Sequence, residues 1–272
     1  MDMKTKLGLG AALAGSFALG ITAVTFSVAQ QSAPVVIEDV DTSFTDLQED
    51  EIRALVKNYL LSNPEVIIEA VNEYSRQQQL AAKARTTELA AANLSELLDP
   101  AHGFVAGKSP DQAKVAVIEL SDYHCGFCKR AAPLVRALTE DESDVKVVFR
   151  EYPILREESN YAAEVALAAR EQGKFLDMHF AMMEAEGVLT EDRIAKIAKK
   201  HNVNLNKLET SLQESNIAST LTRTQEIARD MQIGGTPAFI VASVDGEYLN
   251  VVEGFRPDEL LDSIDKARAA AK

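Results

Sequence analysis

The sequence predicts an α/β fold, and three observations lead to this prediction. Residues 115–150 contain an apolar β-type run, a helical pattern and a second β-type run, which is the order of a β-α-β unit. Residues 157–231 carry only helical patterns. After residue 237 two β-type runs return, and a helical pattern ends the chain. A chain of 272 residues with this order suits one α/β domain plus an extension.

The first 29 residues have the features of a secretory signal peptide. A basic start with Lys4 and Lys6 is followed by an apolar stretch that ends in small residues before Ala29. The stretch approaches the length of a membrane span, so a retained anchor is the alternative to cleavage after Ala29. In both cases we expect the rest of the chain to be exported, to the periplasm.

Residues 30–43 lack a helical period and are predicted to form a tether, and residues 44–100 to form an N-terminal helical segment. Thr45 and Gln48 have the spacing of a capping box, and Asn63-Pro64 marks a second helix start. From there to about Leu98 no further proline or glycine occurs. Such a helix cannot bury its own apolar side chains, so we expect it to pack on a second chain or on the following domain. A solvated linker helix is the alternative.

Residues 101–272 are predicted to form the catalytic domain, whose elements we list in order. Strands are expected at 103–106, 114–121, 145–150, 238–241 and 248–252, helices from near Cys125 and at 257–270, and a helical insertion at about 155–232. Asp245-Gly246 is the expected hairpin turn between the last two strands. This order is that of the thioredoxin fold with an inserted helical subdomain.

Cys125 and Cys128 are the only cysteines, and they lie where a predicted strand gives way to a helix. A helix N-terminus stabilises a thiolate, the reactive form of cysteine. A zinc site would need four ligands, but there is no second cysteine pair and the four histidines are scattered. A structural disulfide here would close a loop of only four residues and constrain the unfolded chain little. In an exported protein the pair therefore favours thiol–disulfide exchange, with no metal or cofactor.

The charge excludes two classes of partner. The formal net charge is −14 at pH 7. Such a surface repels the phosphates of nucleic acids and anionic lipid headgroups. We therefore expect no nucleic acid as a partner.

A second motif, Gly234-Gly235-Thr236-Pro237, precedes the returning strand. Together with the C-x-x-C motif it resembles the DsbA-like and DsbC-like thioredoxin-fold oxidoreductases, over about residues 102–270. The N-terminal segment, with its Tyr59-Leu-Leu-Ser-Asn-Pro-Glu-Val run, resembles the ScsC-type (suppressor of copper sensitivity) members. Those are copper-tolerance thiol oxidoreductases that self-associate through this region. The resemblance thus implies a homo-oligomer.

The resemblance also assigns roles to residues at the dithiol. It implies that Cys125 is the exposed nucleophile, Cys128 the buried resolving sulfur and Pro237 a cis-proline beside them, with Thr236 offering its backbone to an extended substrate strand. A trans proline at a strand start is the alternative for Pro237. Glu119 is the one charged residue in an apolar strand, and the resemblance implies that it relays protons to Cys128. Its alternative is an acid that faces solvent or pairs with a lysine.

Three residues around the cysteines have less specific signals. His124, if protonated, could help to hold a thiolate, or it is a solvated loop histidine. Phe127 and Tyr123 are candidates for an apolar rim that binds unfolded substrates. The Gly126-Phe127 pair resembles the Cys-Gly-Tyr-Cys motif of isomerases more than the strongly oxidising DsbA motif.

These observations lead to a functional hypothesis. We expect a disulfide isomerase or reductase that acts on unfolded or misoxidised exported proteins and is kept reduced by a membrane thiol reductant of the DsbD/ScsB type. Two alternatives stay open. One is a dithiol oxidase of the DsbA type, and the other is a non-catalytic holdase or Cu(I)-binding protein whose two thiolates would chelate the metal.

Overall fold

The computed structural model describes residues 44–214 and 216–272, in two compact units that divide between Asn63 and Pro64. The predicted signal peptide and tether lie outside the described residues. In the first unit, α1 (Asp46–Ser62) begins at the capping box that the sequence predicted. The Thr45 hydroxyl accepts from the Gln48 amide, and the Gln48 side chain accepts from the Thr45 amide. None of the α1 residues is buried within its unit.

The second unit is built on a five-stranded sheet with the order β1-β3-β2-β4-β5. Its strands are β1 (Phe104–Ala106), β2 (Val115–Ser121), β3 (Val145–Glu151), β4 (Ala238–Ser243) and β5 (Leu249–Glu253). Strands β2 and β3 are parallel, and α4 (Gly126–Glu140) connects them as the predicted β-α-β unit. The other pairs are antiparallel. The fold is thus the predicted α/β thioredoxin fold.

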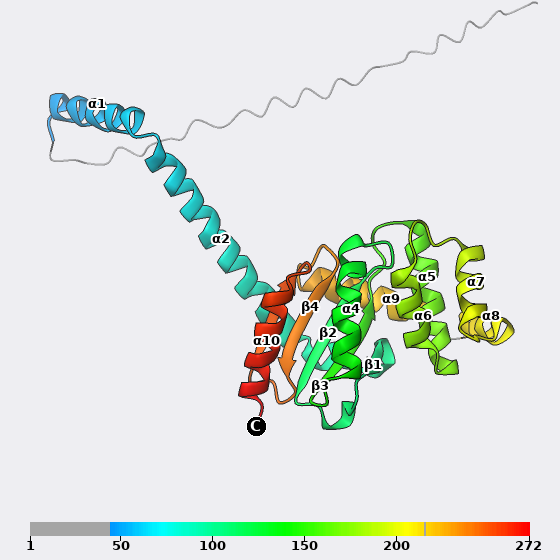
Figure 1. Ribbon diagram of the computed structural model, residues 1–272. Coiled ribbons are helices and arrows are strands. Elements are labelled where there is room, and N and C mark those ends of the chain that lie inside the picture. The colour runs from blue at the N-terminus through cyan, green and yellow to red at the C-terminus, as the bar shows by residue number, and fades with distance from the viewer. Residues whose placement is uncertain (1–43, 215) are drawn as a thin grey trace, which may run out of the picture. The chain divides into compact units, whose positions relative to one another are not determined.

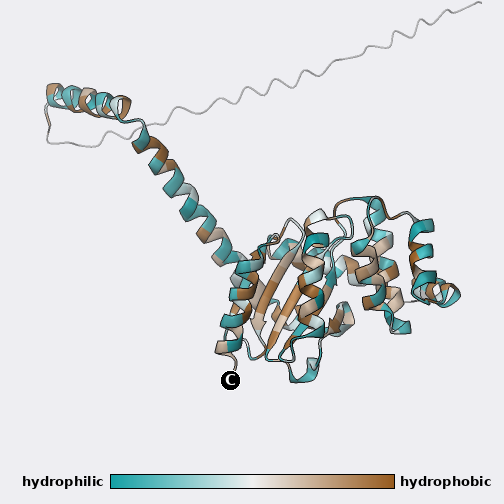
Figure 2. Ribbon diagram, in the orientation of Figure 1, coloured by the Kyte–Doolittle hydropathy of each residue, from teal (hydrophilic) through white to brown (hydrophobic). Residues whose placement is uncertain are grey.

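Helices cover both faces of the sheet (Figure 1). On one face lie α4 and α10 (Pro257–Ala270), and on the other lie α9 (Ile217–Asp230) and the end of α2 (Glu65–Ala92). Successive side chains of a strand point to opposite faces, so Val117 joins the core under α4 while Ile118 joins the core under α9. Because both faces are buried, β2 and β4 are mostly apolar, as Figure 2 shows, and Glu119 is the one charged residue in these two strands.

The inserted helices are α5 (Glu157–Ala169), α6 (Phe175–Glu184), α7 (Glu191–Lys200) and α8 (Leu205–Glu214), with the short 3-10 helix η3 (Arg170–Gln172) after α5. The predicted insertion at 155–232 also contained α9. In the structure Ile227 and Met231, at the end of α9, belong to the core on the back of the sheet. Helix α9 is therefore part of the thioredoxin core, and α5–α8 form the inserted helices.

The predicted single helix up to about Leu98 is two helices, α2 (Glu65–Ala92) and α3 (Leu94–Leu97). Asn93 separates them, and its side chain donates to the Leu89 carbonyl. Ala90 and Leu97 are buried in the core against the back of the sheet. The compact unit therefore begins before residue 101, because the end of the N-terminal helical segment supplies core residues. No helix among the described residues combines the length and the apolar character needed to cross a bilayer.

Candidate active site

Cys125 is the N-cap residue of α4, and its sulfur lies among hydrogen-bond partners. Its Sγ accepts from the Cys128 amide at 3.4 Å, and the thiol donates to the Thr236 carbonyl at 3.1 Å. Hydrogen bonding to the Cys128 side chain outweighs burial and lowers the pKa of Cys125 to about 5. The positive end of the α4 dipole acts in the same direction. Cys125 is therefore suited to be a thiolate at neutral pH.

Cys128 lies in the opposite environment. Its side chain is fully buried, and burial raises the pKa of its thiol far above the usual value. Cys125 is only 5% exposed, so the expectation of an exposed nucleophile is wrong in that detail. The Thr236 carbonyl covers the Cys125 sulfur, and the nucleophile reaches solvent only at its edge. Both thiols are free.

Glu119 is buried below the dithiol. It points to the same face of β2 as Val117, toward α4, and is 1% exposed. Its Oε2 atom has no hydrogen-bond partner. Burial, followed by the charge of Cys125, raises the pKa of Glu119 to about 8. The alternative of a solvent-facing or lysine-paired acid is thus wrong, while the relay role stays a prediction.

Pro237 lies directly before β4, and the Thr236–Pro237 peptide bond is cis, as the resemblance implied. The Pro237 carbonyl accepts from the Gly254 amide, which fixes the loop against β5. The Thr236 carbonyl faces the Cys125 thiol. Pairing of Thr236 with a substrate strand stays a prediction.

His124 is neither a solvated loop residue nor a cationic partner of the thiolate. Its Nε2 accepts from the Leu189 amide at 3.0 Å, so the proton is on Nδ1, which lies 3.0 Å from the Ser159 hydroxyl. The Ser159 hydroxyl in turn donates to Asp122. Burial lowers the pKa of His124, which keeps it neutral. His124 therefore positions the redox loop through the inserted helices.

The predicted apolar rim is only half correct. Tyr123 is fully buried, and its hydroxyl lies 2.6 Å from Glu151 Oε1 and 3.0 Å from His179 Nδ1. Phe127 is 53% exposed, and the Arg130 guanidinium lies over its ring at 4.1 Å. Phe127 alone of the two is available for contact with a substrate.

Sequence reasoning missed two residues that shape the site, Asp122 and Lys129. The Asp122 carboxylate accepts four hydrogen bonds, from the amides of His124, Ile154 and Leu155 and from Ser159. The Lys129 ammonium donates to three carbonyl groups at the C-terminal end of α6, those of Met182, Met183 and Ala185. The only signals for them in the sequence were an acidic residue three positions before Cys125 and a basic residue directly after Cys128.

We expect Lys129→Met to lower the free energy of unfolding by about 1–3 kcal/mol, because charge-assisted bonds to the end of α6 are lost. Urea unfolding of the reduced protein measures this. Arg130→Met is the matched control, since Arg130 is exposed and contacts only the Phe127 ring among the interactions described. Equal stability of the two variants would show that the Lys129 bonds contribute no net stability.

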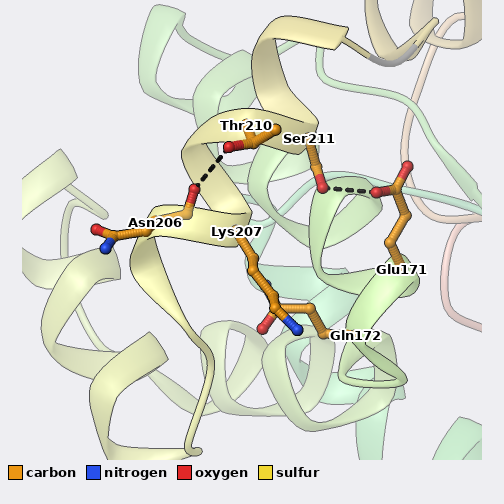
Figure 3. A pocket seen from close by; sticks show the side chains of 6 residues that line it. All are labelled: Glu171, Gln172, Asn206, Lys207, Thr210 and Ser211. Carbon is orange, nitrogen blue, oxygen red and sulfur yellow. Dashed lines mark hydrogen bonds between the residues drawn. The ribbon is translucent and has the colours of Figure 1, made fainter.

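A separate polar cavity of about 630 Å³ lies in the inserted helices, lined by Glu171, Gln172, Asn206, Lys207, Thr210 and Ser211 (Figure 3). The Ser211 hydroxyl donates to Glu171, and Thr210 donates to the Asn206 carbonyl. None of the predicted site residues lines it.

Across the described part of the chain, no three His, Cys, Asp or Glu side chains come together as metal ligands.

A model of the DSBA-like thioredoxin domain matches residues 116–265, from β2 into α10. The chain belongs to the DsbA-like thioredoxin family. This family consists of thiol–disulfide oxidoreductases. The match includes both cysteines, Glu119 and Pro237. A model described as the N-terminal domain of copper resistance protein ScsC matches residues 48–81, which cover most of α1 and the first part of α2.

Solved structures resemble this DsbA-like chain along most of their own length. BcfH of Salmonella enterica Typhimurium is 29% identical, covers 82% of this chain and 96% of its own, and has a TM-score of 0.69. A thioredoxin-like oxidoreductase of Silicibacter pomeroyi is 34% identical, covers 64% and 96%, and has a TM-score of 0.58. Among curated proteins, Na(+)/H(+) antiporter NhaA 3 of Salinispora tropica is 30% identical over 166 residues, 59% of this chain and 25% of that protein. The chain spans about a quarter of the length of the curated relatives it matches.

Proposed function

We propose that this DsbA-like protein catalyses thiol–disulfide exchange on exported proteins in the periplasm, mainly as an isomerase and reductase. The observation that supports this is the contrast between the two thiols. Cys125 has a lowered pKa and lies at the edge of the surface, whereas Cys128 is buried with a raised pKa. Cys125 is therefore suited to attack a substrate disulfide, and Cys128 to attack the mixed disulfide that Cys125 then forms.

The reaction begins when the Cys125 thiolate attacks one sulfur of a substrate disulfide. A bond forms between Cys125 and that sulfur, and the other substrate sulfur leaves as a thiolate. In isomerisation, another substrate thiolate attacks the bonded substrate sulfur and releases Cys125. In reduction, Cys128 loses its proton and attacks Cys125, so that the protein gains a disulfide and the substrate gains two electrons.

Glu119 is proposed to handle the proton of Cys128. The carboxyl is buried on the strand under α4, and its pKa of about 8 is near neutrality. A group with such a pKa can accept the proton when Cys128 attacks and return it when Cys128 leaves. Its charge acts on Cys128 and raises the pKa of that thiol.

Isomerisation is proposed because the N-terminal helices offer a surface for self-association. Large apolar side chains are exposed on α1 (Leu47, Ile52, Leu55, Val56 and Tyr59) and on α2 (Ile67, Ile68, Val71, Tyr74 and Leu80). Several exposed apolar side chains on one helix are typical of a protein interface, and α1 and α2 each carry such a set. An oligomer would bring several dithiols to one misoxidised substrate, and Phe127 would contact its apolar segments.

A reductant must return two electrons after each reduction, and we propose a membrane thiol reductant of the DsbD/ScsB type.

The copper-resistance description of the matched N-terminal model favours Cu(I) binding as a second candidate function. In that case the soft thiolates of Cys125 and Cys128 would bind the ion.

The proposal is tested by reactivation of scrambled ribonuclease with reduced protein that begins at residue 30. We expect Leu55→Gln and Tyr59→Gln together to disrupt the oligomer and to abolish most isomerase activity. Lys57→Gln, on the opposite side of α1, is the matched control. It should change neither the oligomeric state nor the isomerase activity. Both variants should still reduce a small disulfide at the normal rate, because the dithiol is unchanged.

Three outcomes would argue against parts of this proposal. Isomerase activity that survives loss of the oligomer would make the helices a spacer. Efficient oxidation of reduced ribonuclease without isomerisation would favour a DsbA-type oxidase. Absence of all exchange, combined with tight Cu(I) binding, would favour the copper-binding candidate.

A further inference from the structure

Asp122 is a buried residue in the turn that leads from β2 to the dithiol. It follows Ser121, the last residue of β2, and its carbonyl accepts from the Cys125 amide at 3.0 Å. Asp122 thus holds the first position of a four-residue turn that ends at Cys125. Aspartate is favoured there because its side chain can accept from the amide two residues further on. Asp122 Oδ1 accepts from the His124 amide at 2.7 Å in this way.

Such a turn needs only one bond from its aspartate, but the Asp122 carboxylate accepts four. The Ser159 hydroxyl, on α5, donates to Oδ1 at 2.8 Å. The amides of Ile154 and Leu155, in the loop before α5, donate to Oδ2 at 2.9 and 3.0 Å. These three donors lie 32 to 37 residues away along the chain. The carboxylate therefore fixes the turn to a distant segment of the domain.

The burial of this charge is costly and needs a reason. Asp122 is 1% exposed, and a buried carboxylate loses its hydration. In the described part of the chain the one basic side chain within 4.0 Å of it is that of His124, whose pKa burial lowers, so that it is neutral. The four hydrogen bonds replace the lost hydration. A neutral side chain could close the same turn, so the turn alone does not account for the charge.

The backbone of Asp122 contacts both cysteines. Its carbonyl accepts from the Cys125 amide. Burial raises the pKa of Cys128, and hydrogen bonding from the Asp122 backbone opposes this effect. The turn therefore contacts the backbone of the nucleophile and the sulfur of the second thiol. A displacement of the turn would change the position of the two sulfurs relative to each other.

We propose that Asp122 is a positioning residue for the step in which Cys128 attacks the mixed disulfide. Its carboxylate fixes the turn, and the turn aligns Cys128 with Cys125. In this step the Cys128 proton goes to Glu119, the Cys125–Cys128 bond forms and the substrate sulfur leaves as a thiolate. The preceding attack by Cys125 on the substrate needs no such alignment. This inference rests on the exchange chemistry of the proposed function.

The test uses the reduced full chain and an equimolar aromatic disulfide whose thiolate is coloured. The first release of colour reports attack by Cys125, and the second reports attack by Cys128 on the mixed disulfide. Both rates are measured at pH 7 by stopped flow. Circular dichroism shows whether each variant is folded.

We expect Asp122→Asn to slow the second step by about 10- to 100-fold, because a reacting group displaced by about 1 Å can lose a factor of about 100 in rate. An amide has only one acceptor oxygen, so the variant cannot keep all four bonds. The first step should stay close to the wild-type rate. Loss of a negative charge beside a developing thiolate would by itself make the second step faster. The expected slowing is thus opposite to the effect of charge.

Ser159→Ala is a second variant, which keeps the charge of Asp122 and removes one of its four bonds. It should slow the second step by a smaller factor and leave the first step unchanged. Asp245→Asn is the matched control, because Asp245 also accepts from the amide two residues further on, in the turn between β4 and β5. That turn follows the end of β4 opposite to Pro237. Both steps should therefore keep their wild-type rates in this variant.

Two results would overturn the inference. One is a second step that is as fast as in the wild type, or faster, in Asp122→Asn and Ser159→Ala. The other is an equal slowing of both steps, which would indicate general damage and not a loss of alignment. If Asp122→Asn does not fold, Ser159→Ala alone decides between these outcomes. A wild-type protein that shows no second step would instead contradict the proposed function, so the two failures can be told apart.

Discussion

Replacement of Cys128 with alanine is expected to turn the protein into a trap for its substrates. Cys125 loses the hydrogen bond from the Cys128 thiol but keeps its place at the N-terminus of α4 and the bond from the backbone amide of residue 128, so attack on a substrate disulfide still occurs. The mixed disulfide then lacks the buried thiol that resolves it. Resolution by a dissolved thiol at millimolar concentration should be slower by about a thousandfold or more, because the intramolecular partner is lost.

The trapped species is measured on non-reducing gels and by mass spectrometry with a misoxidised substrate. Cys125→Ser is the matched control and should form no adduct, while the double variant should be inert. An adduct formed by Cys125→Ser but not by Cys128→Ala would reverse the assigned roles. A protein that forms no adduct in either variant, but loses Cu(I) binding in both, would be the copper-binding alternative.

The fold could be predicted from the sequence because the central strands are buried on both faces. Such strands leave continuous apolar runs, as at β2 and β4, and these runs are visible without any partner. The limits of the insertion could not be predicted in the same way. Helix α9 has the same amphipathic pattern as its neighbours, and only its tertiary contacts place it against the sheet.

The residues of the candidate site also differ in how far they could be predicted from the sequence. The cysteine pair is a local motif, and its place at the start of α4 followed from the sequence. The cis-proline beside it was implied only by the family resemblance, because Thr236 lies 111 residues from Cys125 along the chain. The state of His124 depends on Ser159 and Leu189, which are 35 and 65 residues away along the chain. Local pattern holds no information on such partners, so both expectations for His124 were wrong.

The inserted helices hold the redox loop from several sides. Tyr123 contacts His179 on α6, His124 contacts Ser159 on α5, and Lys129 contacts the end of α6. His124 and Lys129 flank the C-x-x-C motif directly, and Tyr123 precedes His124. A change in the packing of α5 or α6 should therefore alter the reactivity of the dithiol as well as stability.

The reduced protein should gain stability, relative to Cys125→Ser, as the pH rises above 5. The pKa of Cys125 is lowered from 9.0 to about 5 by hydrogen bonds from Cys128 and its surroundings. A group with a lowered pKa in the folded state stabilises fully above its unfolded pKa, and this contribution is lost as the pH falls through the folded value. Between pH 4.5 and pH 7 we expect a difference of about 2 kcal/mol, after allowance for screening at a sulfur on the edge of solvent.

Urea unfolding of both proteins under reducing conditions measures this difference. The comparison with Cys125→Ser is needed because Glu119 acts with the opposite sign. Its pKa is raised to about 8, so its burial costs stability as the pH rises from 4.5 toward 8. Both proteins contain Glu119, and most of its contribution cancels in the difference.

Alkylation by iodoacetamide gives an independent value for the same ionisation. We expect the rate at Cys125 to reach half its plateau near pH 5 and to be flat above pH 7. The plateau rate itself should be modest, because nucleophilicity falls as the pKa of a thiol falls. The test of the Cys125 pKa is therefore the pH midpoint of alkylation and not the plateau rate. A midpoint near 9 would mean that the N-terminus of α4 and its hydrogen bonds do not stabilise the thiolate. The exchange mechanism would then need another base for Cys125.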